Sequence, residues 1–284
     1  PTLSREVPAL LARDDVETIV VRGAGEPVRP HARTLVADAV TADPEDRSDR
    51  AARAWTGHWV FASRELLEQQ SDEVAAPLVS AGGSDDLAAA REFARAELAA
   101  RRAPISRRAL ALAVWRATWP HDRLVLGASR LIRELDAVAP GKKITVHANR
   151  GLAGIDGTIA TALGIAVASQ AGGAAGVTRL VLGDLALLHD VGALLLPPHE
   201  REPRIQLIVG NDGGGTIFDD LEVADVAARE DMERVLYTPH SVRIEQLALA
   251  YGWEYQRVTT RAALDQALTS PVGGRQIIEV PLPR

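Results

Sequence analysis

The hydrophobic positions between residues 102 and 284 follow two alternating patterns. Short runs that are apolar throughout are typical of strands buried on both faces of a parallel sheet. They alternate with longer segments whose apolar residues recur every three or four positions, which predicts helices with one buried face. This alternation predicts an α/β fold in which a mainly parallel sheet is flanked by helices. We expect strands, with the loops after them, at 122–129, 142–151, 178–184, 204–215, 255–259 and 275–282, and helices at 105–119, 130–138, 155–170, 186–198, 244–253 and 261–269.

The first hundred residues show a weaker version of this pattern. Residues 17–22 predict a short buried strand, and residues 33–40 predict a second one. Residues 43–57 are charged and turn-like, and 56–70 predict a strand that continues into a helix. A further helix is expected over 87–103, because this segment is rich in alanine and in pairs of opposite charge.

Two residues mark the ends of the helix expected over 87–103. Ser84 lies in a glycine-rich loop and is suited to cap the N-terminus of the helix, and Pro104 excludes its continuation. We therefore expect two α/β domains. The first covers 1–101 and includes this helix as a linker, and the second covers 102–284 and contains the parallel sheet.

Polar and glycine-rich residues follow four of the expected strands at the point where each strand ends. Ser129, Asp184, Asn211 and the loop 147–157 all occupy such positions, whereas the strand bodies are apolar. Ligands of open α/β sheets bind beyond the carboxyl ends of the strands. The sequence therefore predicts a binding site at this edge of the sheet.

The residue types at two of these strand ends indicate a metal and an anion. Asp184 and Asn211 offer oxygen ligands, which suit Mg²⁺. Gly183 and the glycine run 213–215 allow the backbone to approach a bulky ligand, and the helix that begins near Leu185 directs its N-terminus to the same place. Together they predict a site for a metal and a diphosphate. The simpler alternative is that Asp184 caps its helix and that the glycines only form turns.

The composition excludes several other classes of protein. The net charge is −6, so there is no basic excess to neutralise nucleic-acid phosphates. The chain has no cysteine, which rules out disulfides and thiolate metal sites and is consistent with the cytoplasm. Residues 157–176 are the least polar long stretch, but they are rich in Gly and Ala and lack aromatic anchors. We interpret them as a buried helix and a loop, so no membrane span is expected.

The remaining motifs favour structural roles. Residues 23–28 lack the third glycine of a dinucleotide fingerprint, and we interpret them as a turn. We interpret His189 and Asp190 as a pair on a helix surface and His240 as a capping or packing residue. A local basic cluster is interpreted as a solvated helix start. Its members are Arg101, Arg102, Arg107 and Arg108.

The spacing of the two strand-end motifs carries a resemblance to a known superfamily. Asp184 follows Gly183, and Asn211 lies 27 positions after Asp184 and is followed two positions later by Gly213. This arrangement resembles the thiamine-diphosphate motif of the decarboxylase and acetohydroxyacid-synthase superfamily. The resemblance implies that the Asp184 and Asn211 side chains and the Gly213 carbonyl bind Mg²⁺ or Mn²⁺, which in turn holds the diphosphate of the cofactor.

Four segments together carry a narrower resemblance. Residues 127–133, 149–157, 183–190 and 211–218 resemble the MenD family of menaquinone biosynthesis, with NRGLAGIDG at 149–157 as the most specific match. The resemblance implies decarboxylation of 2-oxoglutarate and addition of the four-carbon unit to isochorismate. It implies cofactor contacts by Ile155, Gly183, Asp184, Leu185, Asn211, Gly213 and Gly214, and substrate contacts by Ser129, Arg133, Arg150, Ile217, Phe218 and Leu221.

The sequence departs from the family pattern at two points. Gly210 stands where the family often has a second asparagine. The family also takes a catalytic glutamate from an N-terminal pyrimidine-binding domain, which 1–100 do not resemble; they resemble most of the middle domain instead. We therefore expect the chain to be the C-terminal part of a homodimeric or homotetrameric enzyme, with no catalytic residue of its own and no turnover alone. The alternatives are another thiamine-diphosphate enzyme of 2-oxo acids, or a non-catalytic binding module of the same fold.

Overall fold

The computed structural model describes residues 6–21, 33–41, 49–69, 87–149, 154–271 and 273–284, and Ser84 and Arg150 lie outside them. The chain forms two compact units, Pro1–Ser71 and Asp72–Arg284. The expected helix at 87–103 is present as α3 (Leu87–Arg102) and groups with the second unit. The assignment of 1–101 to a middle domain stays a prediction.

The first unit contains short elements. These are α1 (Glu6–Leu11), β1 (Thr18–Val21), β2 (Thr34–Ala37) and α2 (Arg50–Gln69). The two expected strands are confirmed, and they pair in parallel. The strand expected to begin at residue 56 is wrong, because α2 is helical from Arg50 onward. The turn-like structure expected at 43–57 is wrong for 50–57 for the same reason, and 43–48 lie outside the described residues. The Asp49 carboxylate accepts the backbone N–H groups of Ala51 and Ala52 and so caps this helix.

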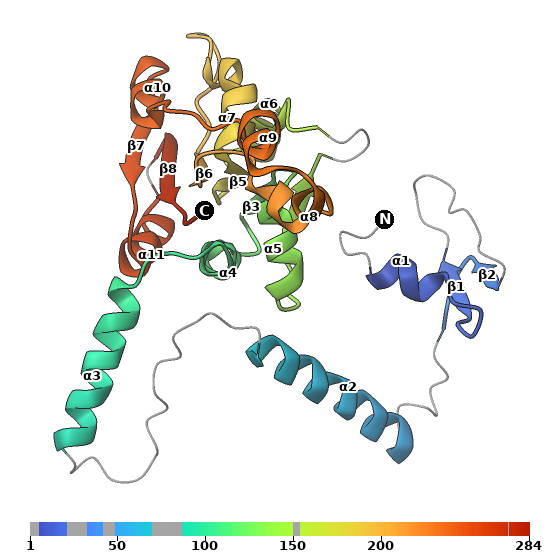
Figure 1. Cartoon of the computed structure of the whole chain (residues 1–284). Helices are drawn as coiled ribbons and strands as arrows, with labels where there is room; N and C mark the ends of the chain where they lie inside the picture. The colour runs from blue at the N-terminus through green and yellow to red at the C-terminus, as the bar shows by residue number, and fades with distance from the viewer. Residues whose placement is uncertain (1–5, 22–32, 42–48, 70–86, 150–153, 272) are drawn as a thin grey trace. The chain divides into compact units, whose positions relative to one another are not determined.

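The second unit is built around a six-stranded sheet in which all strands are parallel, as expected (Figure 1). The strand order is β4-β3-β5-β6-β8-β7. The strands are β3 (Arg123–Leu126), β4 (Thr145–Ala148), β5 (Thr178–Gly183), β6 (Ile205–Asn211), β7 (Glu254–Arg257) and β8 (Arg275–Pro281).

Helices cover both faces of this sheet. The side chains of each buried strand alternate between two apolar clusters; Val181, for example, belongs to one cluster, and Leu180 and Leu182 belong to the other. One face packs against α4 (Arg107–Ala117), α5 (Arg130–Val138) and α11 (Arg261–Thr269). The opposite face packs against α6 (Thr158–Ser169), α7 (Asp184–His189) and α10 (Ile244–Ala250). Figure 1 shows these two helix groups on opposite sides of the strands.

The helix expected at 186–198 ends early, at His189. After α7 the chain forms only a 3₁₀ turn, η2 (Val191–Leu194). The Asp190 carboxylate accepts the N–H groups of Ile159 at 2.6 Å and Ala160 at 3.2 Å, and so caps the N-terminus of α6. The interpretation of His189 and Asp190 as a surface pair is therefore wrong for Asp190.

The segment between β6 and α10 has no counterpart among the expected elements. It forms η3 (Thr216–Asp220), α8 (Val223–Val226), α9 (Arg229–Asp231) and the π-helical turn η4 (Met232–Tyr237). Thr238 then adopts a left-handed conformation with φ 41°. The Tyr237 carbonyl accepts the Gly215 N–H at 2.7 Å, so the end of this segment packs against the loop after β6. In the described part of the chain, no helix is long and apolar enough to cross a membrane.

Candidate functional site

The carboxyl ends of β5 and β6 lie side by side. Gly183 pairs with Gly210, so Asp184 and Asn211 leave neighbouring strands at the same level of the sheet. The Gly214 N–H donates to Asp184 Oδ2 at 2.9 Å, which joins the loop after β6 to the start of α7. Two segments that the sequence placed at strand ends are thus in direct contact.

Asp184 is a buried carboxylate with only 2% of its surface exposed. Its Oδ1 accepts the Leu185 N–H at 2.7 Å, and its Oδ2 lies 3.0 Å from Nε2 of His240. Burial and the nearby charge of Asp212 raise the pKa of Asp184 above its ordinary value, and hydrogen bonds from His240 and Leu185 partly offset this. The site therefore holds a carboxylate whose charged form is costly without a cation.

Asn211 has a fixed amide orientation. Its Oδ1 accepts the Gly213 N–H at 3.1 Å, and its Nδ2 donates to Glu279 Oε1 at 2.8 Å. Gly214 adopts φ 148°, and a Cβ there would lie 2.3 Å from the Tyr237 carbonyl oxygen. Only glycine fits this position, because both the backbone conformation and the close approach exclude a side chain.

These residues fit a hard divalent cation. The donor set combines the Asp184 carboxylate, the Asn211 amide oxygen and the Gly213 carbonyl, which are oxygen ligands of the kind that Mg²⁺ and Mn²⁺ prefer. Arg284 Nη2 donates to the Gly213 carbonyl at 3.3 Å. Among the described residues no group of three His, Asp or Glu side chains is placed to hold a metal. A cation at this site therefore needs the Asn211 amide oxygen and the Gly213 backbone carbonyl as ligands beside Asp184.

A cavity of about 170 Å³ lies beside this donor set. It is bounded by residues from α4, α5, the turn before α6, both strand ends, α7 and η3. A Cβ added at Gly183 would meet no atom within 4 Å, so glycine leaves open space there. The cavity contains eight of the residues proposed from sequence: Ser129, Ile155, Gly183, Asp184, Leu185, Gly214, Ile217 and Phe218.

Three of the proposed substrate residues are not among those that line this cavity. Arg133 is exposed, and its Nη1 donates to the Ser129 carbonyl at 2.5 Å. Leu221 follows the end of η3. Arg150 lies outside the described residues. Ser129 itself has φ 102°, a strained conformation for a residue with a side chain, of the kind that clusters at binding sites.

Sequence reasoning missed several polar residues of the site. Arg107 Nη2 donates to Asp212 Oδ2 at 2.8 Å and to Thr216 Oγ1 at 3.3 Å, and all three residues line the cavity. The interpretation of Arg107 as solvated is therefore wrong, since only 11% of its side chain is exposed. His240, expected to cap or pack, accepts the Val242 N–H at Nδ1 and in addition contacts Asp184 through Nε2. Among these residues, only Asp212 could have been recognised from the sequence, because it lies between Asn211 and Gly213 of the predicted motif.

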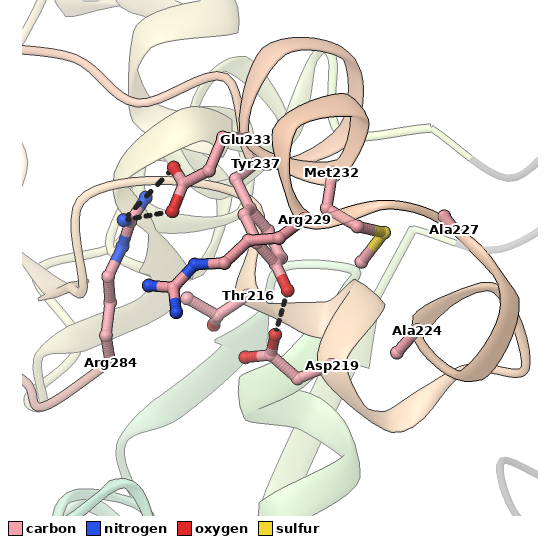
Figure 2. A pocket seen from close by; sticks show the side chains of 9 residues that line it. All are labelled: Thr216, Asp219, Ala224, Ala227, Arg229, Met232, Glu233, Tyr237 and Arg284. Carbon is pink, nitrogen blue, oxygen red and sulfur yellow. Dashed lines mark hydrogen bonds and ion pairs between the residues drawn. The ribbon is translucent and has the colours of Figure 1, made fainter.

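A second cavity of about 360 Å³ is lined by residues of η3, α8, α9 and η4 and by Arg284 (Figure 2). Its polar residues largely pair with one another. The Tyr237 hydroxyl donates to Asp219 Oδ1 at 2.5 Å, and Arg284 Nη1 lies 3.4 Å from the Glu233 carboxylate. The cavity contains none of the residues proposed from sequence, and it shares only Thr216 with the first.

Known proteins show what the chain is similar to. No family model matches. The 2-succinyl-5-enolpyruvyl-6-hydroxy-3-cyclohexene-1-carboxylate synthase of Clavibacter michiganensis is 57% identical over 291 aligned residues, which cover 100% of this chain and 49% of that synthase. The chain is homologous to the MenD family along its whole length. The MenD synthase of Leifsonia xyli is 56% identical over 100% of this chain and 50% of its own length. The chain thus spans about half the length of the curated MenD relatives it matches.

Solved structures agree on the fold. A thiamin diphosphate-dependent enzyme from Mycobacterium smegmatis matches with a TM-score of 0.51 at 18% identity, over 64% of this chain and 33% of that one. Benzoylformate decarboxylase from Polynucleobacter necessarius matches with a TM-score of 0.51 at 17% identity, over 62% and 33%. The fold expected from the MenD resemblance is therefore confirmed.

Packing explains why Gly210 departs from the asparagine that the MenD resemblance places there. A Cβ at Gly210 would lie 2.8 Å from Leu282 Cδ1 and 2.9 Å from Leu131 Cδ1. We expect Gly210→Asn to lower the free energy of unfolding by about 1–3 kcal/mol, because the amide must displace packed leucines inside the core. Urea unfolding measures this.

The matched control for Gly210→Asn is the same change at Gly183, its register partner. A Cβ at Gly183 would meet nothing within 4 Å, and its φ of −81° suits any residue. Gly183→Asn should therefore shift the unfolding midpoint much less. Equal midpoints for the two variants would contradict this account of Gly210.

Proposed function

We propose that this chain is the thiamine-diphosphate-binding half of a MenD-type synthase. The observation that carries the proposal is the contact between the two strand ends, in which the Gly214 N–H donates to the Asp184 carboxylate beside a cavity. That contact brings the two halves of the superfamily motif together. The 57% sequence identity to the Clavibacter michiganensis synthase, across the whole chain, supports the same conclusion.

The proposed roles of the residues are those that the MenD resemblance implies. Asp184, Asn211 and the Gly213 carbonyl hold Mg²⁺ or Mn²⁺, which neutralises the diphosphate. Gly183, Leu185 and Gly214 accommodate the diphosphate, and Ile155 supports the body of the cofactor. Thiamine diphosphate, when bound, supplies stabilisation of a carbanion equivalent. The protein would bind and orient the cofactor and exclude water from the apolar side of the cavity.

The proposed substrates are 2-oxoglutarate and isochorismate, which carry several carboxylates. Arg133 and Arg150 are proposed to bind them, because guanidinium groups pair with carboxylates through two parallel hydrogen bonds. Ser129 is proposed to add a polar contact. The apolar walls of the site are proposed to be Ile217, Phe218 and Leu221.

The proposal also covers the partners of this chain. Residues 1–101 are proposed to be a middle domain, and a pyrimidine-binding domain outside the chain is proposed to supply the glutamate that activates the cofactor. We infer a homodimer or homotetramer, with the site shared between subunits, acting in the cytoplasm in menaquinone biosynthesis.

The test follows loss of isochorismate by the full-length protein in the presence of 2-oxoglutarate, thiamine diphosphate and Mg²⁺. The proposal requires loss that depends on all three additions. Carbon dioxide release from other 2-oxo acids without isochorismate loss would instead indicate a different thiamine-diphosphate enzyme. Cofactor binding without either reaction would indicate a binding module.

A further inference from the structure

Glu279 is a buried carboxylate whose two hydrogen-bond partners, Asn211 and Tyr255, are neutral. It lies in the middle of β8, between β6 and β7, and only 8% of its surface is exposed. Its Oε1 accepts from Asn211 Nδ2 at 2.8 Å, and its Oε2 accepts from the Tyr255 hydroxyl at 2.5 Å. Within the described part of the chain no Lys, Arg or His forms an ion pair with it. A buried carboxylate without a cation is costly, so its presence calls for a reason.

The carboxylate determines which way the Asn211 amide points. An ionised carboxylate only accepts hydrogen bonds, so Asn211 must present its NH₂ group to Glu279. Its oxygen then faces the opposite side, where it accepts the Gly213 N–H at 3.1 Å. If the amide turned over, its NH₂ group would face the proposed cation, and two donors would meet at Gly213.

Tyr255 holds Glu279 from the other side. Burial, followed by the hydrogen bond and the charge of Glu279, raises the pKa of the Tyr255 hydroxyl well above its ordinary value. The phenol therefore keeps its proton and donates it to Glu279. Three adjacent strands thus contribute one chain of hydrogen bonds, from Tyr255 on β7 through Glu279 on β8 to Asn211 on β6.

We propose that Glu279 is a positioning residue for the metal, which aims the Asn211 oxygen at the cation and places a negative charge behind it. This inference rests on the metal site of the proposed function. Partners behind a metal ligand fix its orientation, and their loss typically weakens metal affinity about 10–100-fold. A purely structural role, tying β6 to β7, is the competing explanation.

The test measures Mn²⁺ affinity of the full-length protein with thiamine diphosphate, from the electron paramagnetic resonance signal of free Mn²⁺. Glu279→Met removes the acceptor at similar length, and it should raise the Mn²⁺ Kd about 10–100-fold. Glu279→Gln keeps an acceptor for Asn211 and loses only the charge, so it should restore part of the affinity. Tyr255→Phe loosens Glu279 alone and should have a smaller effect than Glu279→Met.

The matched control is Gln276→Met on the same strand. Gln276 is also buried and pairs with β6, accepting from Gln206 Nε2 at 2.9 Å, but it lies away from the strand ends. This variant should lower the thermal midpoint and leave the Mn²⁺ Kd unchanged. If Glu279→Met also leaves the Kd unchanged, or if Gln276→Met weakens it equally, the positioning role is overturned. If the wild-type protein and its Asp184→Asn variant bind Mn²⁺ equally, the proposed metal site itself fails.

Discussion

Replacing Asp184 by asparagine is expected to remove metal-dependent cofactor binding. Asp184 provides the only carboxylate among the three proposed ligands, and asparagine keeps its size while removing its charge. Loss of a partner behind a ligand already weakens metal affinity about 10–100-fold. Loss of the charged ligand should therefore raise the apparent Kd for thiamine diphosphate with Mg²⁺ by more than about 100-fold.

Thermal stability provides a readout of this loss that does not depend on catalysis. A ligand at 100 times its Kd stabilises the native state by about 2.7 kcal/mol, and at a Kd 100-fold weaker the same concentration contributes only about 0.4 kcal/mol. The rise in Tm with Mg²⁺ and thiamine diphosphate should thus almost vanish in Asp184→Asn. The Tm without ligands shows whether the variant is folded.

Asp212→Asn is the matched control for this experiment. Asp212 is a second carboxylate of the same cavity, but Arg107 and the Thr216 hydroxyl already bind its Oδ2. Its variant should keep most of the ligand-induced rise in Tm. If the rise in Tm is instead kept in Asp184→Asn and lost in Asp212→Asn, the assignment of the metal to Asp184 is wrong.

The sequence was sufficient for the parts of the fold that depend on local patterns. Apolar runs form the centres of β5 and β6, at 180–182 and 207–209, and the structure buries all but the last residue of each strand. The position of Asp184 and Asn211 followed from the strand ends, because the carboxyl ends of parallel strands share one edge of the sheet. A serine before a helix is a favoured N-cap, and Ser106 has this role in α4, where its hydroxyl oxygen accepts the Ala109 N–H.

The parts that sequence did not predict depend on contacts between distant residues. Arg107 was interpreted as solvated because its partner, Asp212, lies 105 positions away. Asp190 follows the end of α7, and its carboxylate caps α6, whose N-terminus lies 31 positions away in the sequence. The segment from η3 to η4 consists of single turns and a π-helical turn, and these are too short to produce a hydrophobic period.

Replacing Asp122 by alanine is expected to destabilise the second unit strongly. Asp122 and Arg179 form a buried ion pair at 2.6 Å, with 4% and 3% of their side chains exposed. The same carboxylate accepts the N–H groups of Val177 and Trp119 at 2.9 Å each. Removing it leaves a buried guanidinium without its anion, so we expect a loss of about 3–5 kcal/mol in urea unfolding. The exposed Asp136 provides the control, since Asp136→Ala should change stability by less than about 0.5 kcal/mol.

The destabilisation should depend on pH in a defined direction. Burial by itself raises the pKa of Asp122, but hydrogen bonds from Trp119 and Val177 and the Arg179 guanidinium outweigh it, so the pKa lies below its ordinary value. A carboxylate with a lowered folded pKa contributes stability above its unfolded pKa of about 3.9 and loses it as the pH falls through the folded pKa. The difference between wild type and Asp122→Ala should therefore be constant above about pH 5 and shrink below about pH 4. A difference that stays constant down to pH 2 would contradict the ionic role of Asp122.

A double variant separates the charge of Arg179 from the hydrogen bonds of Asp122. Arg179 also donates from Nη2 to the Leu268 carbonyl at 3.0 Å, so it links β5 to α11. If the unpaired guanidinium causes most of the loss, Asp122→Ala combined with Arg179→Met should be more stable than Asp122→Ala alone, because an apolar side chain is tolerated where a lone buried charge is not. If the double variant is no more stable, the lost backbone hydrogen bonds of Val177 and Trp119 account for the effect. Asp122 would then act mainly as the acceptor that fixes the start of β3 against β5.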